Sequence, residues 1–177
     1  SASAGLNAFI PLLIVAIMAK FTNLITLADP WNTLESWWII GLLVVLSVIE
    51  FFADKVPAIN HANDVIQTVV RPAAGAIAFA AAANVITDVN AVLSLAIGLF
   101  VAGSVHVAKS AAVRPAVTAT TGGAGNIPVS IAEDIIAAVI SILAVVIPIV
   151  IGVVLSLIIA WIILRWWRNI NQERVEA

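Results

Sequence analysis

The sequence predicts an all-α protein that crosses a membrane several times. Its composition, its long apolar runs and the placement of its tryptophans all indicate this. Of the 177 residues, 63% are hydrophobic and 10% are charged, whereas soluble domains average about 45–50% and about 25%. A soluble core of this size cannot hide so much apolar surface, so we expect a lipid bilayer around the chain. The predicted fold is a single polytopic domain over residues 1–177, with about five spans and broken or re-entrant segments.

The spans follow from the apolar runs, because a helix needs about 20 mostly apolar residues to cross a bilayer. Five stretches come close to this requirement, at roughly 8–27, 37–53, 73–87, 91–109 and 129–165. The last is longer than a hydrocarbon core of about 30 Å demands. We therefore predict one long, tilted helix there, kinked at Pro148.

Between the spans, three stretches read differently. Residues 58–70 mix polar side chains with an apolar side, which predicts a short amphipathic or re-entrant helix, and Pro72 should mark its boundary. The stretch Thr118–Pro128 (TATTGGAGNIP) contains three glycines and a proline, which favour irregular backbone. Residues 166–177 form a polar tail.

The five-span topology gathers all six tryptophans on one side of the membrane, as expected of residues that prefer the interface. Most of the ionisable residues then lie on the opposite side. The basic tail predicts that the tryptophan side is cytoplasmic. The tryptophans are Trp31, Trp37, Trp38, Trp161, Trp166 and Trp167.

Charge and cysteine usage exclude several classes of function. The formal charge of −2 gives no basic surface for nucleic acid. The chain has no cysteine, so disulfides and thiolate metal sites are excluded. No phosphate-binding glycine loop, serine elbow or His-Glu-x-x-His helix is present. We therefore expect neither a metal nor a cofactor, and no catalytic residue.

Two pairs of segments indicate an internal repeat. Gly41–Val48 resembles Gly98–Val105, and each is followed by an Arg-Pro-Ala triplet. Ser1–Pro11 and Thr118–Pro128 are both rich in small and hydroxyl residues and both end in Ile-Pro. Duplication is a frequent basis of transporter architecture, but chance similarity in a small apolar alphabet stays the alternative.

Several motifs resemble one family along essentially the whole chain. They are SAxAGxN at residues 1–7, ADKxP at 53–57 followed by Asp64 to Thr68, RPxxGA at 71–76, and GNxP at 125–128 followed by Glu133-Asp134. This pattern is similar to a family of small bacterial integral membrane proteins described only as a domain of unknown function. The resemblance implies a multi-pass protein of the bacterial inner membrane and no assigned activity.

Two clusters of ionisable residues are candidate sites, because charge at membrane depth costs about 2.5–3.5 kcal/mol per residue on insertion scales. Glu50 and Asp54 share a helix face, and so do His106 and Lys109. The alternative is a set of structural ion pairs, such as Asp54 with Arg71 or Lys55 with Asp64. The two clusters comprise Glu50, Asp54, Lys55, His61, Asp64 and Arg71, and His106, Lys109, Arg114, Glu133 and Asp134.

The two hydroxyl- and glycine-rich segments are a third candidate. Irregular backbone at membrane depth survives only when it is buried in protein or lines water. Its hydroxyls, amides and free carbonyls can replace the hydration shell of an ion. We expect Asn7, Thr120 and Asn126 to line such a path. The alternative is an exposed glycine loop that caps the next helix.

These observations favour a transporter or channel for a small solute or ion. Two arginines suit an anion, because a guanidinium grips carboxylate or phosphate in a fork. The expected partners are the lipid bilayer, a small anion or other ion, and further copies of the chain. One alternative is a structural or partner-binding membrane protein without transport. Another is an intramembrane enzyme acting on lipid head groups.

Overall fold

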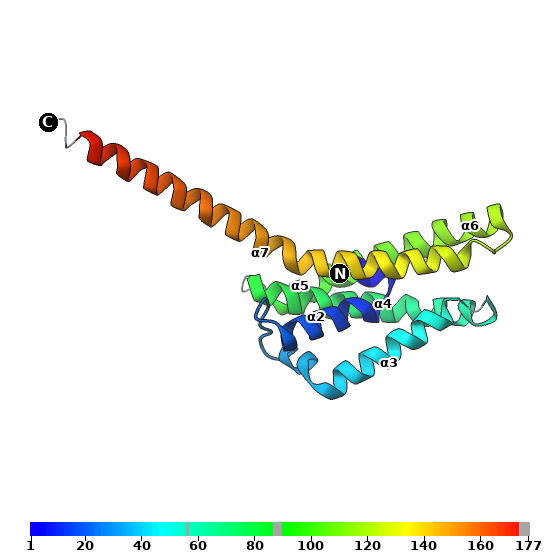
Figure 1. Cartoon of the computed structure of the whole chain (residues 1–177). Helices are drawn as coiled ribbons and strands as arrows, with labels where there is room; N and C mark the ends of the chain where they lie inside the picture. The colour runs from blue at the N-terminus through cyan, green and yellow to red at the C-terminus, as the bar shows by residue number, and fades with distance from the viewer. Residues whose placement is uncertain (56, 87–89, 174–177) are drawn as a thin grey trace. The chain divides into compact units, whose positions relative to one another are not determined.

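The computed structural model describes residues 1–55, 57–86 and 90–173. The side chains of 57–62, 84–86, 149, 152, 166 and 168–173 lie outside this description. The chain forms two compact units, Ser1–Ile142 and Leu143–Ala177. Every regular element in the described part is helical, which confirms the predicted all-α class (Figure 1).

The chain begins with a broken helix. A short α1 (Ala2–Leu6) is followed by Asn7, whose backbone is extended at φ −141° and ψ 129°. Helix α2 (Phe9–Phe21) then begins, and the Asn7 side-chain oxygen caps it by accepting the N–H groups of Phe9 and Ile10 at 3.1 and 3.0 Å. With 13 residues, α2 is about 20 Å long, shorter than the hydrocarbon core of about 30 Å. A break in the first hydroxyl-rich segment is therefore confirmed.

After the 3₁₀ turn η1 (Trp31–Glu35), α3 covers Trp37–Ala53. Helix α4 then runs from Pro57 to Ile86 without interruption, with Pro72 inside it. The boundary predicted at Pro72, and the separate segment at 58–70, are therefore wrong. The cost of a helix-interior proline is about 3 kcal/mol. Close packing of the rest of α4 along α5 offsets this loss.

Helix α5 (Ala91–Ala108) continues through a π-helical turn, η2 (Lys109–Val113), into α6 (Arg114–Thr121). We attribute the wide turn to Pro115, which has no N–H and clashes with the carbonyl four residues before it. The irregular backbone predicted at Thr118–Pro128 is confined to 122–125. The threonines before it stay helical, with their hydroxyls bonded to carbonyls of the preceding turn. Gly122 ends α6 in the left-handed conformation at φ 61°.

Helix α7 extends from Asn126 to Glu173 and passes through Pro148. Three helical stretches of the described chain are long and apolar enough to cross a membrane: Asn63–Ala83, Ala91–Thr121 and Asn126–Arg165. Helices α2 and α3 are apolar but shorter. The chain is thus an apolar helical membrane protein, and the count of five spans stays a prediction.

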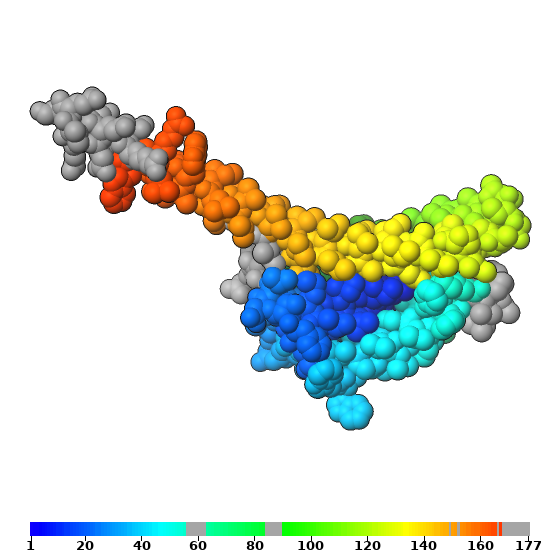
Figure 2. Space-filling view, viewed as in Figure 1, coloured from blue at the N-terminus to red at the C-terminus, as the bar shows by residue number. Residues whose placement is uncertain are grey.

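Helices α4 and α5 lie side by side and form the most extensive helix pair of the first unit (Figure 1). Small residues permit the close approach. A Cβ atom added to Gly98 would lie 2.5 Å from the carbonyl oxygen of Gly75 and 2.7 Å from the Cα of Ala76. Such small-residue contacts are typical of helices that associate in lipid. In Figure 2 the start of the chain (blue) lies between α3 (cyan) and the first part of α7 (yellow).

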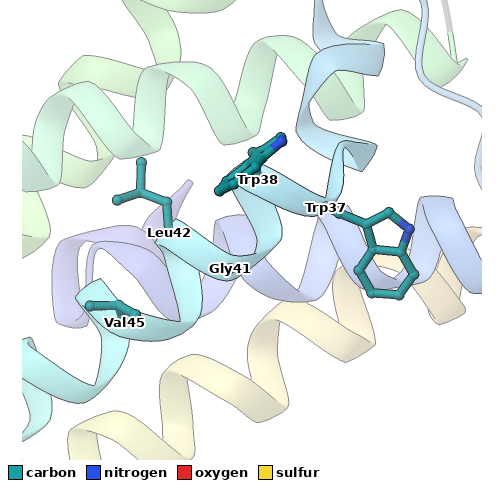
Figure 3. A pocket seen from close by; sticks show the side chains of 5 residues that line it. All are labelled: Trp37, Trp38, Gly41, Leu42 and Val45. Carbon is teal, nitrogen blue, oxygen red and sulfur yellow. The ribbon is translucent and has the colours of Figure 1, made fainter.

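The distribution of polarity is the reverse of that in a soluble protein. The largest fully buried side chains include Arg71, Glu50 and Asn7, while many large apolar side chains are exposed. Trp38 is 90% exposed, and together with Trp37 it borders a shallow apolar depression at the start of α3 (Figure 3). This arrangement fits contact with the hydrocarbon of a bilayer, where apolar side chains face outward and charge is kept inside.

Candidate functional site

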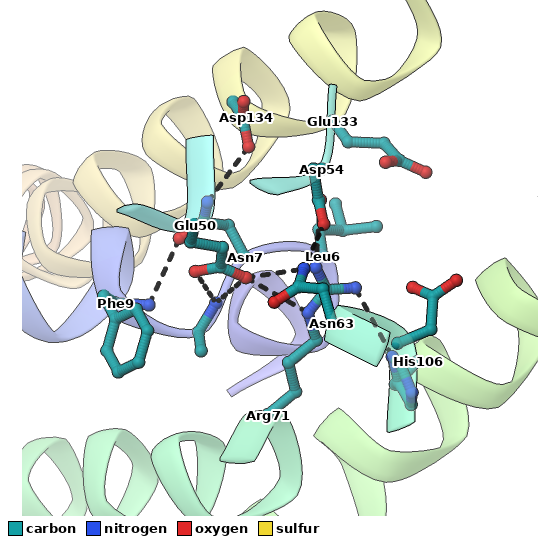
Figure 4. Close-up of polar contacts among 12 residues, drawn as sticks. Leu6, Asn7, Phe9, Glu50, Asp54, Asn63, Arg71, His106, Glu133 and Asp134 are labelled. Atoms are coloured by element: carbon teal, nitrogen blue, oxygen red, sulfur yellow. Dashed lines mark hydrogen bonds and ion pairs between the residues drawn. The ribbon is translucent and has the colours of Figure 1, made fainter. Parts of the chain in front are cut away.

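Eight charged side chains meet inside the first unit, and we call this set the charged core. It contains four carboxylates and four cations, contributed by the end of α3, by α4, by the α5–α6 junction and by the first turns of α7. Figure 4 shows the four carboxylates with Arg71. Seven of the eight residues are buried, and the Lys55 side chain is 12% exposed. The charged core comprises Glu50, Asp54, Lys55, Arg71, Lys109, Arg114, Glu133 and Asp134.

Glu50 ties three helices together at the break in the N-terminal helix. Its two carboxylate oxygens accept the N–H of Ala8 at 3.1 and 3.0 Å. One of them also accepts Arg71 Nε at 3.2 Å and Nη2 at 3.0 Å. The start of α2 thus directs its free N–H and its partial positive charge at a carboxylate from α3. The buried backbone of the break is satisfied in this way, as a lipid environment demands.

Asp54 lies one residue beyond the end of α3 and is 3% exposed. Its Oδ2 atom is 3.1 Å from Arg71 Nη2, 3.4 Å from Arg114 Nη2 and 3.5 Å from Lys109 Nζ. Its Oδ1 atom accepts a hydrogen bond from Asn63 at 2.6 Å. Burial alone would raise the pKa of the Asp54 carboxyl. The positive charges of Lys109, Arg71 and Arg114 outweigh this effect and hold that pKa below its ordinary value.

The first turns of α7 supply the remaining two carboxylates. Glu133 Oε2 lies 2.8 Å from Lys109 Nζ and 3.3 Å from Arg114 Nη2. Asp134 Oδ2 pairs with Lys55 Nζ at 3.0 Å, and its Oδ1 accepts the Asn7 amide at 3.0 Å. This part of α7 is therefore joined to the bundle through polar side chains.

His106, 2% exposed, connects the charged core to a hydrogen-bonded chain on α4. Its Nδ1 lies 3.4 Å from Arg71 Nη1, and its Nε2 lies 3.3 Å from the Thr68 hydroxyl. A guanidinium can only donate, so Nδ1 must accept and the imidazole is neutral with its proton on Nε2. The Thr68 hydroxyl in turn donates to the Asp64 carbonyl at 2.8 Å.

The structure brings together ten of the fourteen predicted site residues, namely the charged core with Asn7 and His106. Asp64 contributes only its carbonyl to this network. Thr120 bonds within α6, and Asn126 donates to Thr118 beside the α6–α7 turn at 2.9 Å. The prediction that Asn7 and Asn126 line one path is therefore not supported by their contacts. The side chain of His61 lies outside the described residues.

One of the two ion pairs expected as a structural alternative is present, and the other is replaced. Arg71 does pair with Asp54. Lys55, however, pairs with Asp134 and not with Asp64. Asp64 and Lys55 are close in sequence, but the α3–α4 turn directs Lys55 toward α7.

Several groups that take part in this polar network were not predicted from the sequence. The Ala8 N–H and the Leu6 carbonyl, which accepts Lys109 Nζ at 3.0 Å, are main-chain groups without a sequence signal of their own. The hydroxyls of Ser141 on α7 and Ser3 on α1 share a hydrogen bond at 2.9 Å, and both are buried. Ser3 belongs to the predicted hydroxyl-rich segment, whereas no pattern singled out Ser141. Asn63 lies in the polar stretch that was singled out at 58–70, so that stretch was the available signal for this residue.

The arrangement holds paired charges inside an apolar bundle. Each carboxylate of the charged core contacts at least one cation, and one carboxylate oxygen contacts three. The shallow depression at Trp37 and Trp38 contains none of the predicted site residues (Figure 3). The chemical interest therefore lies in the charged core.

Comparison with known proteins adds a family and no activity. No curated protein and no solved structure matches the chain. A family described as "Domain of unknown function (DUF4126)" matches residues 1–168, nearly the whole sequence. This finding confirms the resemblance read from the SAxAGxN, ADKxP and RPxxGA motifs to a family without an assigned function. The chain belongs to the DUF4126 family of proteins.

Proposed function

We propose that this protein moves a small solute or ion across the membrane and that the charged core forms part of the route. The observation that supports this most is the burial of four carboxylates and three cations, with Lys55 at their edge, in a bundle with an apolar exterior. Stability alone does not demand such a core. Replacing a buried ion pair by apolar residues of similar volume is often neutral or stabilising by about 1–4 kcal/mol. Ionisable residues inside a membrane protein generally mark pathways for ions or substrates.

The break between α1 and α2 supports the same proposal. Transporters commonly place discontinuous helices at their binding sites, where half-helix ends supply free N–H and C=O groups. Here the Ala8 N–H is bound by Glu50 and the Leu6 carbonyl by Lys109. Both ends of the break thus contact charged side chains that can exchange partners when a solute enters.

Flux through proteoliposomes tests the proposal. Purified protein is reconstituted, and proton, sodium, potassium and chloride fluxes are measured with ion-sensitive dyes. We expect flux of at least one of these ions. Arg71→Lys should reduce it at least tenfold, because an ammonium cannot reproduce the contacts of the guanidinium with both Glu50 and Asp54.

The matched control is Arg165→Lys on α7, where the arginine stacks over Trp161 at 5.3 Å from the ring centroid and takes no part in the charged core. This variant should keep its flux. Absence of flux by the wild-type protein for all four ions counts against transport. Equal flux in Arg71→Lys and wild type counts against the charged core as the route.

A second candidate is a structural or partner-binding protein whose charged core only locks the helices together. The balance of four carboxylates against four cations supports this alternative. Exchanging the charges of one pair, Lys55→Glu with Asp134→Lys, separates the two proposals. If the pair only locks the helices, the exchanged protein should regain both the Tm lost in either single variant and the wild-type flux. If the pair lies on the route, the exchanged protein should regain its Tm and still lose flux.

A further inference from the structure

The surroundings of Asp54 differ from those of the other carboxylates in the charged core. Three cations from α4, η2 and α6 meet at its Oδ2 atom: Arg71 at 3.1 Å, Arg114 at 3.4 Å and Lys109 at 3.5 Å. Glu133 contacts two of the cations, while Glu50 and Asp134 contact one each. Among the described carboxylates of the core, Asp54 is therefore the one that contacts the most cations.

Arg114 brings hydrogen-bonding capacity that the protein does not use. It is 6% exposed, and only its Nη2 atom is bonded, to Asp54 and Glu133. Its Nε and Nη1 atoms have no partner among the described residues. A guanidinium carries five N–H donors, and buried donors without acceptors are costly. The site can therefore bind more acceptor atoms than the Asp54 carboxylate provides.

Asp54 itself is held at this point by a short tether. It lies in the turn that follows α3, where the regular helix has ended, and its side chain places one carboxylate among three cations. In chemical terms a tethered carboxylate is equivalent to a bound formate ion. A free anion of the same charge can take its place, and the charge balance of the core is kept when the Asp54 carboxylate moves out as the anion enters. A cation at this point would be repelled by all three positive groups.

We propose that the Asp54 carboxylate occupies a binding site for a small monovalent anion, of the size of formate or chloride, and that the anion replaces it during transport. This inference rests on the proposed function, for which it names the class of solute. Arg71, Lys109 and Arg114 bind the anion. Asp54 closes the site when no anion is present.

Removal of the tethered carboxylate tests the site directly. In Asp54→Ala the three cations face an empty volume, and free anion should fill it. The Tm of the purified variant in detergent is measured in sodium formate and in sodium gluconate at equal ionic strength. Gluconate is too large for the volume of one carboxylate. We expect formate to raise the Tm of Asp54→Ala by several degrees over gluconate, because a ligand that binds only the folded state stabilises it. Wild type should show a smaller difference.

Asp134→Ala is the matched control, because it also removes a buried aspartate of the charged core. Asp134 contacts a single cation, Lys55, and the Asn7 amide. Its removal should give a formate effect less than half of that in Asp54→Ala. Equal Tm values for Asp54→Ala in the two salts, or equal formate effects in the two variants, overturn the anion site. If Asp54→Ala cannot be purified in either salt, Asp54→Gly takes its place with the same expectation, since it also removes the carboxylate and empties its volume beside the three cations.

Chloride flux separates this inference from the proposed function. With the site open at all times, Asp54→Ala should move chloride at least tenfold faster than wild type in proteoliposomes. If wild type moves protons or sodium and neither protein moves chloride, transport stands and the anion is overturned as its solute. If formate stabilises Asp54→Ala selectively while no ion moves in either protein, the anion site is supported and the proposed function fails.

Discussion

The side-chain amide of Asn7 donates a hydrogen bond to the carboxylate of Asp134 at 3.0 Å, although 127 residues separate the two in sequence. The same asparagine accepts the N–H groups of Phe9 and Ile10 and so caps α2. One fully buried side chain therefore terminates the helix break and joins it to α7. Asp134 in turn forms an ion pair with Lys55 at the end of α3.

We predict that Asn7→Ala lowers the free energy of unfolding by about 2–4 kcal/mol. Loss of a helix cap costs about 1 kcal/mol. Loss of a buried hydrogen bond to a charged group costs about 1.5–3 kcal/mol more. Thermal unfolding in detergent, followed by circular dichroism, measures the change.

Asn90→Ala is the matched control for this variant. Asn90 caps α5 in the same way, accepting the N–H groups of Val92 and Leu93 from an exposed position. Its loss should cost only about 1 kcal/mol. Asn7→Ser keeps an acceptor for the cap, so its loss of unfolding free energy should lie between those of Asn7→Ala and Asn90→Ala. Equal losses for Asn7→Ala and Asn90→Ala would show that the contact with Asp134 adds nothing to stability.

Arg71 and Glu50 should be strongly coupled. Arg71→Met leaves two buried carboxylates without this partner and should destabilise by about 3–5 kcal/mol. Glu50→Gln also leaves the guanidinium partly unpaired. In the double variant each change removes part of the penalty of the other, so we expect a coupling energy of about 1–3 kcal/mol. A double-mutant cycle on Tm and chemical unfolding measures it, and strict additivity would contradict the described contact.

Alanine substitutions at two glycines distinguish the effect of helix packing on stability from the effect of helix propensity. A Cβ at Gly98 would press on the main chain of α4, 2.5 Å from the Gly75 carbonyl oxygen, so Gly98→Ala should cost about 1–3 kcal/mol. A Cβ at Gly41 on α3 would meet nothing within 4 Å. Gly41→Ala should therefore be neutral or stabilise by up to about 1 kcal/mol. The Tm of Gly98→Ala should be lower than that of Gly41→Ala. An unchanged Tm in Gly98→Ala would mean that α4 and α5 are less closely packed than the structure shows.

The sequence was a good guide to the helices and a poor guide to their contacts. Apolar runs predicted the existence of α3, α5 and α7, because lipid leaves the backbone few other conformations, and the runs of α5 and α7 are long enough to span a bilayer. The prediction of a helix boundary at Pro72 was wrong, because packing of α4 against α5 overrides the local cost of a proline inside a helix.

For the charged core, the residue types predicted which side chains take part, but not which cation pairs with which carboxylate. The cost of burying charge singled out Glu50 and Arg71 in one predicted cluster and Glu133 in a second. The structure joins the two clusters through Asp54 and Arg114. Which cation meets which carboxylate depends on how distant helices pack. Lys55 accordingly forms an ion pair with Asp134 on α7 and not with Asp64, which is nearer in sequence. Contributions from the main chain, such as the N–H of Ala8, appear only once the break in the helix is located.

Cysteine labelling can settle the number of spans, because the chain contains no native cysteine and each introduced one is unique. With five spans, the exposed positions Thr33 and Ala91 lie on one side of the membrane and Ala124 lies on the other. In sealed vesicles of one orientation, a membrane-impermeant maleimide should therefore react with Ala124→Cys or with both other variants, but not with all three. If α4 does not cross, Thr33 and Ala124 lie on one side and Ala91 on the other, so the label will react either with Ala91→Cys alone or with the other two variants together. Labelling after detergent lysis shows that every introduced thiol is reactive, so a missing signal in intact vesicles reports sidedness alone.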